Sequence, residues 1–203
     1  MSSGQVKPSK VMLIRHGEKL GDPATDDEGG PDLSVRGSAR AAALPALFAP
    51  ASPEIDCVID GNHGSFDAKY GSEQITGPPP RFVTPDFMIA TADSKHSNRP
   101  RETATPTAIA LGVPFDPKTY SNSEKDIKKL VDDLTSKKEY DGKVILICWH
   151  HGTIATIAQK LGVASPPPWH GSVFDRVWVI DFTQTPLTVD NQPQQLLYGD
   201  SPT

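Results

Sequence analysis

The hydrophobic pattern of this chain is organised around two short apolar runs. They are "KVMLIRH" at residues 10–16 and "GKVILICWHH" at residues 142–151, and both are continuous and contain β-branched residues. A short run without polar alternation predicts a strand that is buried on both faces of a sheet. Weaker runs at 81–93 and 174–182 predict two more strands, and "QQLLYG" at 194–199 predicts a short last one.

Helical spacing of apolar residues occurs between these strands. In "SEKDIKKLVDDLTSKK" at residues 123–138, the charged residues fall on one helix face and four apolar residues fall on the other: Ile127, Leu130, Val131 and Leu134. Three further segments combine helical spacing with residues that favour helix starts or ends: residues 33–48, 99–112 and 153–162. The pattern therefore predicts four helices interleaved with the strands.

Strands that alternate with helices predict a layered α/β domain with a mostly parallel sheet. We expect a three-layer α/β/α sandwich that residues 1–203 form as a single domain, because a chain of this length closes one hydrophobic core without splitting. Residues 57–81 are rich in Gly and Pro and predict a long loop excursion near the ligand-binding edge of the sheet. Such an excursion is either functional or a loose insertion.

Charge and composition exclude several classes of partner. Twenty-five Asp and Glu outnumber twenty Lys and Arg, which gives a net charge of −5, so we expect neither nucleic acid nor an anionic membrane surface as a partner. No apolar run approaches the roughly 18 residues that a membrane helix needs. Cys57 and Cys148 lack the spacing of a disulfide framework or a metal site, so we expect a reducing, cytoplasmic location and no metal centre.

Both buried strands end in a histidine that is followed by a glycine, in "RHG" at residues 15–17 and "HHG" at residues 150–152. Ligands of such sheets lie beyond the carboxyl ends of the strands, where we expect these histidines. A neutral imidazole attacks phosphorus well, and a guanidinium group matches phosphoryl oxygens bidentately. Arg15 and His16 together therefore suit attack on a doubly negative phosphoryl group, although "RHG" alone also fits an ordinary strand end.

Four segments, in one order, resemble the histidine phosphatase superfamily, whose fold is phosphoglycerate mutase-like. "LIRHGE" at 13–18 resembles the opening motif of that family, and "LSVRGSARAAAL" at 33–44 is similar to its next segment. "NRPRETATPTA" at 98–108 resembles the family's second arginine with a threonine four residues later. "VILICWHHGTI" at 144–154 resembles the strand that carries the second histidine. The resemblance covers most of the chain and implies this fold.

The resemblance also implies roles for single residues. It makes His16 the phosphorylated nucleophile and places Arg15, Arg99 and a second histidine around the phosphate. His150 matches the family's spacing into the following helix, whereas His151 matches the position directly before a glycine. Both histidines are therefore kept as candidates for that place.

Protonation of the departing oxygen needs a carboxylic acid or an equivalent group, and the resemblance does not identify it. Gly17 and Glu18 follow the nucleophile, so we expect both to contact the substrate. Glu18 is also one candidate for the acid. Asp93, Asp116 and Glu124 are the others, and each fits an ordinary surface carboxylate equally well.

The resemblance implies a phosphomonoester hydrolase that forms a phosphohistidine on a small phosphorylated substrate. The expected partner is a small phosphate ester or inorganic phosphate, and no cofactor is needed because arginines and imidazoles supply the positive charge. The alternatives are a mutase-type phosphotransferase, a protein phosphohistidine phosphatase, and a phosphate-binding scaffold without turnover. Trp169 and the excursion at 57–81 are candidates for the wall on the substrate side, or for plain packing. The oligomeric state is left open.

Overall fold

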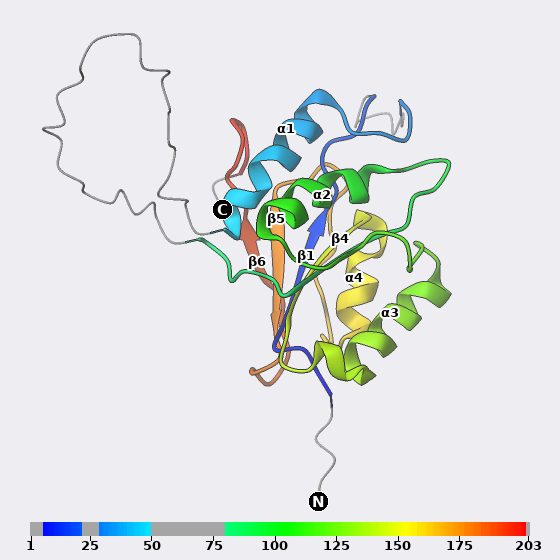
Figure 1. The fold of residues 1–203 in the computed structure, drawn as a ribbon, viewed down its shortest axis with the longest axis vertical. Coiled ribbons are helices and arrows are strands. Elements are labelled where there is room, and N and C mark those ends of the chain that lie inside the picture. The colour runs from blue at the N-terminus through cyan, green and yellow to red at the C-terminus, as the bar shows by residue number, and fades with distance from the viewer. Residues whose placement is uncertain (1–5, 22–28, 50–79, 202–203) are drawn as a thin grey trace, which may run out of the picture.

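The chain folds around one six-stranded sheet, in a computed structural model that describes residues 6–21, 29–49 and 80–201 (Figure 1). The strands lie in the order β3-β2-β4-β1-β5-β6. Their bounds are β1 Lys10–Arg15, β2 Phe87–Ala90, β3 Phe115–Asp116, β4 Val144–Trp149, β5 Arg176–Asp181 and β6 Asp190–Pro193. Only β5 runs antiparallel to its two neighbours, so the expected mostly parallel sheet is confirmed.

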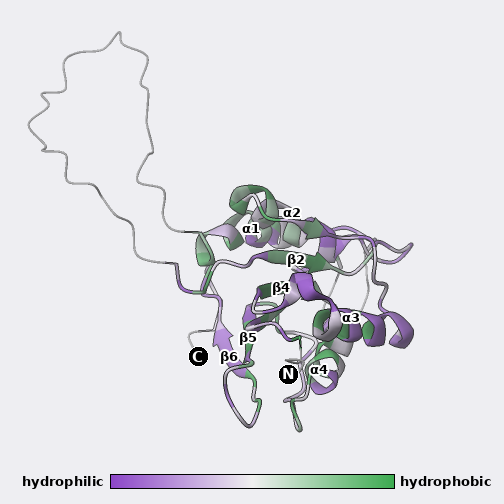
Figure 2. Cartoon of the chain, turned by 60° about the horizontal axis from the view of Figure 1, so that its bottom comes forward, coloured by the Kyte–Doolittle hydropathy of each residue, from purple (hydrophilic) through white to green (hydrophobic). Residues whose placement is uncertain are grey.

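Helices cover both faces of this sheet. On one face lie α1 (Val35–Ala43), the short 3₁₀ helix η1 (Leu44–Leu47) and α2 (Arg99–Leu111). On the other lie α3 (Glu124–Ser136), the short η2 (Lys138–Tyr140) and α4 (His151–Lys160). Figure 2 shows α1 and α2 on one side of β2, β4 and β5, with α3 and α4 on the opposite side. The expected three-layer α/β/α sandwich is thus confirmed.

The apolar run of β1 is buried because it contacts both helical layers. Val11 and Leu13 pack into the hydrophobic cluster under α3 and α4, whereas Met12 and Ile14 pack into the cluster under α1 and α2. All four side chains are 0% exposed. A strand that is covered on both faces has no polar side, which explains the missing alternation in the sequence.

The expected helix signals act where the sequence placed them. The Ser34 side chain caps α1 by accepting the backbone N–H of Gly37 at 3.0 Å. Pro45 follows the end of α1, and the chain continues there as the 3₁₀ helix η1. Gly112 ends α2 with a φ of 63°, a left-handed conformation that favours glycine.

The last strand lies upstream of its expected place. β6 occupies Asp190–Pro193, whereas residues 194–199 form no strand, so that prediction was wrong. The backbone N–H groups of Leu196 and Leu197 instead donate to the Asp200 carboxylate at 2.9 and 3.0 Å. A side chain thus satisfies donors that a sheet ladder would otherwise use.

The two candidates for the wall on the substrate side have different outcomes. Trp169 takes the packing role that the sequence left open, because its ring centroid lies 4.9 Å from that of Trp178 in the core under α3 and α4. The indole N–H of Trp169 donates to the carbonyl oxygen of Val173 at 2.9 Å. Of the excursion expected at 57–81, only residues 80 and 81 are described, and the rest lies outside the described residues.

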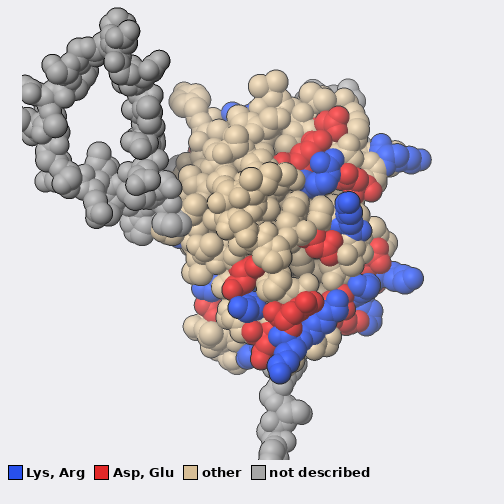
Figure 3. Space-filling model, viewed as in Figure 1, with Lys and Arg blue, Asp and Glu red and all other residues tan. Residues whose placement is uncertain are grey.

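Charged side chains of both signs gather over α3 (Figure 3). Lys128 and Lys129 there pair with Asp132 and Asp133 one turn later, at 2.5 and 2.8 Å. Pairs with this spacing stabilise exposed helices by a few tenths of a kcal/mol each. Within the described ranges, no helix combines the length and apolar character that crossing a bilayer requires.

Candidate active site

The two histidine-bearing strand ends lie side by side, because β1 and β4 are parallel neighbours with Arg15 opposite Trp149. The backbone N–H of His16 extends the ladder by donating to the carbonyl oxygen of Trp149 at 3.1 Å. The ring of His150 then lies against the ring of His16, with centroids 5.3 Å apart and planes at 70°. Two histidines that lie far apart in the sequence thus form one imidazole pair.

The imidazole of His16 is held in one tautomer by its own loop. Its Nδ1 lies 2.7 Å from the carbonyl oxygen of Gly17. A carbonyl oxygen only accepts hydrogen bonds, so Nδ1 carries the proton and Nε2 keeps its lone pair. The side chain is 3% exposed and lines a pocket at the sheet edge. His16 therefore presents a preoriented nucleophilic nitrogen.

Burial keeps both imidazoles neutral. It lowers the pKa of His16 well below the usual 6.5, against the opposing effect of the hydrogen bond to Gly17. The positive charge of Arg15 is a further cause of this lowering. Burial, followed by the charge of Arg99, lowers the pKa of His150 to about 4. Both rings are uncharged at neutral pH, which is the form that attacks phosphorus.

We predict that the His150 ring titrates near pH 4 in the free protein, because a lowered pKa means that the neutral form persists to lower pH. The His16 ring should stay neutral to a pH well below 6.5 as well. Bound inorganic phosphate should raise both midpoints, since its negative charge favours the imidazolium forms. NMR titration of the imidazole resonances, assigned with His150→Gln, measures these midpoints. A midpoint at 6.5 or above for His150 in the free protein contradicts the burial described here.

The Arg15 guanidinium is fixed by backbone carbonyls and an aromatic ring. Its side chain is 1% exposed, and Nη1 donates to the carbonyl oxygens of Gly171 and Val173, the latter at 2.9 Å. Its Cζ lies 3.6 Å from the ring centroid of Phe174. These partners precede β5, and they reach this edge of the sheet because β5 runs antiparallel to β1.

α2 begins at Arg99 and brings a second guanidinium to the site. Arg99 is 3% exposed, and its Nη1 donates to the carbonyl oxygen of Gly30 at 2.7 Å. One turn later, the Thr103 hydroxyl donates to the carbonyl oxygen of Arg99 and accepts the backbone N–H of Gly17, both at 2.8 Å. Thr103 thereby ties the start of α2 to the loop that holds His16.

That loop also lies in backbone contact with α1. A Cβ atom on Gly17 would lie 2.8 Å from the carbonyl oxygen of Gly37, and one on Gly37 would lie 2.3 Å from the carbonyl oxygen of Glu18. No real Cβ contact is that short, so both positions require glycine. Gly17 is not among the residues that line the pocket, and its close approach to Gly37 sets the path of the loop that carries His16.

A pocket of about 210 Å³ opens between these groups. Its lining is Arg15, His16, Lys19, Arg99, Asn122, His150, His151 and Gly152. α4 starts at this pocket, with His150 as N-cap and no side chain capping the helix. A helix start presents N–H donors and the positive end of its dipole, which favours an anion. With the arginines and imidazoles, the pocket suits a phosphoryl group.

Both candidate histidines line the pocket, in different places. His150 contacts the ring of His16 directly. His151 is the first residue of α4. Its Nε2 lies close to Gly171, 3.5 Å from the position that a Cβ atom there would take. The geometry therefore gives His150 the position next to His16 and His151 a position on the wall.

Glu18 follows Gly17 in sequence, but its carboxylate faces α1 and the C-terminal segment. Its Oε1 accepts from Arg36 at 2.9 Å and from Arg40 at 2.7 Å, and Arg40 also binds Asp200 at 2.7 Å. Burial alone would raise the pKa of Glu18, yet the hydrogen bonds and charge of Arg40 outweigh burial and lower it. Glu18 is therefore an ionised carboxylate that does not line the pocket, unlike the substrate contact or proton donor expected from the sequence.

The other candidates for the acid also lie away from the pocket lining. Asp93 pairs with Arg101 at 2.7 Å on the surface. Asp116 accepts two backbone N–H groups of the following turn, both at 3.0 Å. Glu124 is exposed in the first turn of α3. Among the residues that the structure describes, no carboxylate lines the pocket.

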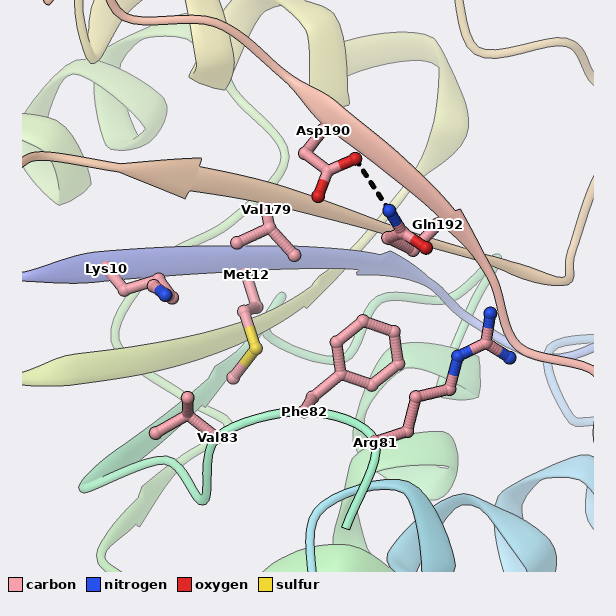
Figure 4. A pocket seen from close by; sticks show the side chains of 8 residues that line it. All are labelled: Lys10, Met12, Arg81, Phe82, Val83, Val179, Asp190 and Gln192. Carbon is pink, nitrogen blue, oxygen red and sulfur yellow. Dashed lines mark hydrogen bonds between the residues drawn. The ribbon is translucent and has the colours of Figure 1, made fainter. Parts of the chain in front are cut away.

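A second hollow, of about 350 Å³, lies toward the opposite end of β1, where Lys10 begins the strand (Figure 4). Its apolar lining includes Met12, Phe82 and Val179, and Arg81 stands at its rim. Among the described residues, no imidazole lines this hollow, and it lacks the pairing of a histidine with two arginines found around His16.

Sequence reasoning missed three contributors to the site. Lys19 lines the pocket and could have been found from its place three residues after His16. Asn122 also lines it, and the one available signal was its position between a parallel strand and the helix cap Ser123. Phe174 gave no signal, because its place depends on the direction of β5.

No protein-family model and no curated protein matches this chain, but several solved structures are similar to it. One similar structure is a candidate phosphohistidine phosphatase SixA from Agrobacterium tumefaciens, with 17% identity over 91% of this chain and 97% of that one and a TM-score of 0.46. A phosphoglycerate mutase from Bacillus anthracis str. Sterne shares 10% identity over 93% and 94%, with a TM-score of 0.49. A candidate phosphohistidine phosphatase SixA from Nakamurella multipartitia shares 14% identity over 93% and 98%, also with a TM-score of 0.49. Because these scores lie below 0.5, the function proposed below rests on the side chains of the pocket.

Proposed function

We propose that this protein hydrolyses small phosphate monoesters through a phosphohistidine intermediate on His16. The observation that carries the proposal is the hydrogen bond from Nδ1 of His16 to the carbonyl oxygen of Gly17, made inside a pocket that Arg15 and Arg99 also line. It leaves Nε2 as the only unprotonated ring nitrogen, next to groups that suit phosphoryl oxygens. A structural histidine would need neither a fixed lone pair nor two buried arginines beside it.

The reaction proceeds in two displacements. Nε2 of His16 forms a bond to phosphorus while the bond from phosphorus to the ester oxygen breaks, and the departing oxygen takes a proton from water. Arg15 and Arg99 hold the equatorial oxygens and stabilise their charge. A water oxygen then bonds to phosphorus and the bond to Nε2 breaks. The proton that this water loses neutralises the hydroxide left by the first displacement, and inorganic phosphate and neutral His16 are released.

The lining of the pocket favours substrates whose leaving group departs without strong protonation. No carboxylate lines it within the described part of the chain, so general acid assistance of the usual kind is missing there. Aryl phosphates and the phosphoramidate of phosphohistidine have such leaving groups. This observation supports dephosphorylation of phosphohistidine as a second candidate function. The cytoplasmic location expected from the cysteines stays a prediction.

We predict a covalent phosphoenzyme on Nε2 of His16 when the protein turns over p-nitrophenyl phosphate. The expected species is a phosphoramidate, which survives alkaline quenching and is lost in acid. Rapid quenching in base, followed by mass spectrometry of the digested protein, locates the modified residue. Phosphate on any other side chain, or turnover without a trapped intermediate under conditions that preserve phosphohistidine, speaks against this mechanism.

Turnover in ¹⁸O-labelled water separates hydrolysis from its alternatives. A hydrolase places one labelled oxygen in the released phosphate. A mutase-type transferase instead moves the phosphoryl group, unlabelled, to the hydroxyl of an added acceptor alcohol. Binding of phosphate without turnover of any phosphorylated compound supports the scaffold.

A further inference from the structure

The side-chain amide of Asn122 has one possible orientation. Its Oδ1 accepts the indole N–H of Trp149 at 2.9 Å and the hydroxyl of Thr153 at 2.5 Å. An indole nitrogen only donates, so an exchange of the amide oxygen and nitrogen would set two donors against each other. Trp149 is 0% exposed at the end of β4, and Thr153 lies in the first turn of α4. Residues of two secondary-structure elements, β4 and α4, thus fix the position of Oδ1.

The amide NH₂ group of Asn122 is left for a ligand. Asn122 lines the His16 pocket, and within the described ranges its Nδ2 donates no hydrogen bond. Asn122 is an exposed residue of this lining, whereas His16 is buried, so the pocket opens to solvent on the side of Asn122. In an in-line displacement the leaving group departs opposite the nucleophile, which here means toward the mouth.

We infer that Asn122 is a specificity-determining residue whose Nδ2–H donates a hydrogen bond to the departing atom of the substrate. This inference rests on the proposed function. An amide donates a hydrogen bond but does not release its proton at neutral pH, so Asn122 stabilises a leaving group that carries a partial negative charge. It thereby assists weakly basic leaving groups and cannot replace a carboxylic acid for strongly basic ones, such as simple alkoxides.

Two variants separate this role from a structural one. Asn122→Ala removes the amide altogether. Asn122→Asp keeps an oxygen acceptor for Trp149 and Thr153 but replaces the donor with a carboxylate, which is ionised at pH 7.5. The new negative charge repels both phosphate substrates alike, so a merely structural Asn122 predicts a change in rate that is the same on both substrates. Asn191→Ala, an exposed amide on β6, is the matched control.

The experiment measures kcat/KM at pH 7.5 with p-nitrophenyl phosphate and with phenyl phosphate, whose leaving group is more basic. For phenyl phosphate we expect both Asn122 variants to lose roughly 10–100-fold, as for a hydrogen bond to a developing charge. For p-nitrophenyl phosphate we expect a smaller loss. Asn191→Ala should match the wild type, and the thermal melting temperature of Asn122→Asp should be near the wild-type value.

Two results overturn the inference. The first is an Asp variant with the wild-type rate on phenyl phosphate, which assigns Asn122 to structure alone. The second is an equal loss on both substrates in the Ala variant, which carries no new charge; this result moves the contact from the departing atom to a phosphoryl oxygen. Either result leaves the proposed function standing, provided that turnover still depends on His16. If His16→Ala turns over as fast as the wild type, the proposed function itself fails.

Discussion

Substitution of His16 by alanine is expected to lower kcat/KM for p-nitrophenyl phosphate by at least ~10⁴-fold, the scale seen when a covalent nucleophile is removed. Among the described residues that line the pocket, no side chain can take its place. The lining residue with the nearest imidazole is His150, whose ring centroid lies 5.3 Å away. Occupying the position of His16 would require His150 to leave its place at the start of α4. The loss should therefore appear mainly in kcat, because it concerns the chemical step.

Binding should survive this substitution. Arg15, Arg99 and the start of α4 stay in place, so the dissociation constant for inorganic phosphate, measured by calorimetry, should change far less than the rate. The matched control is His96→Ala, an exposed histidine in a surface loop, which should keep the wild-type rate. Equal rates for wild type and His16→Ala rule out the phosphohistidine mechanism. A wild type that binds phosphate tightly and shows no turnover points to the scaffold.

Gly37→Ala is expected to give the second largest effect, on stability and activity together. Its new methyl group would lie 2.3 Å from the carbonyl oxygen and 2.8 Å from the amide nitrogen of Glu18. Both are backbone atoms, so either the loop that holds His16 or α1 must move. We expect a loss of about 1–3 kcal/mol in unfolding free energy. The melting temperature should fall by roughly 2–4 °C for each kcal/mol.

The same backbone displacement should also lower the reaction rate. His16 lies two residues before Glu18, and a displacement of about 1 Å at a reacting group can lower the rate by about 10²-fold. Calorimetric unfolding and steady-state kinetics measure the two effects. Ser38→Ala, the exposed neighbour on α1, should be neutral in both. If Gly37→Ala has wild-type stability and rate, the backbone contact yields without cost and does not position His16.

The layers of this fold could be predicted because burial produces a recognisable hydrophobic pattern in the local sequence. β1 and β4 contact hydrophobic clusters on both faces, and two-sided burial produces the continuous apolar runs seen in the sequence. The ends of adjacent parallel strands then meet at one edge. That rule places His16 and His150 at the same edge, and the pairing of β1 with β4 in the structure then makes them neighbours.

The direction of a strand leaves no such pattern in the sequence. Contacts that depend on strand direction could therefore not be predicted. β5 is as apolar as a parallel strand, and its antiparallel course is decided by pairing with β1 and β6. The support of Arg15 by Gly171 and Phe174 was therefore invisible in the sequence. Glu18 was misplaced for a similar reason, because its carboxylate is fixed by Arg40, which Asp200 from the far end of the chain holds in place.

The central position of β1 has a consequence for how the protein is made. β1 leaves the ribosome first among the strands, yet its two partners in the sheet, β4 and β5, are synthesised more than a hundred residues later. At about 5–20 residues per second, this apolar run waits on the order of 10 s for its neighbours. Pairings so distant in sequence also slow folding, since the chain must first close long loops. We therefore expect the nascent chain to be most prone to aggregation at β1 until β5 has emerged.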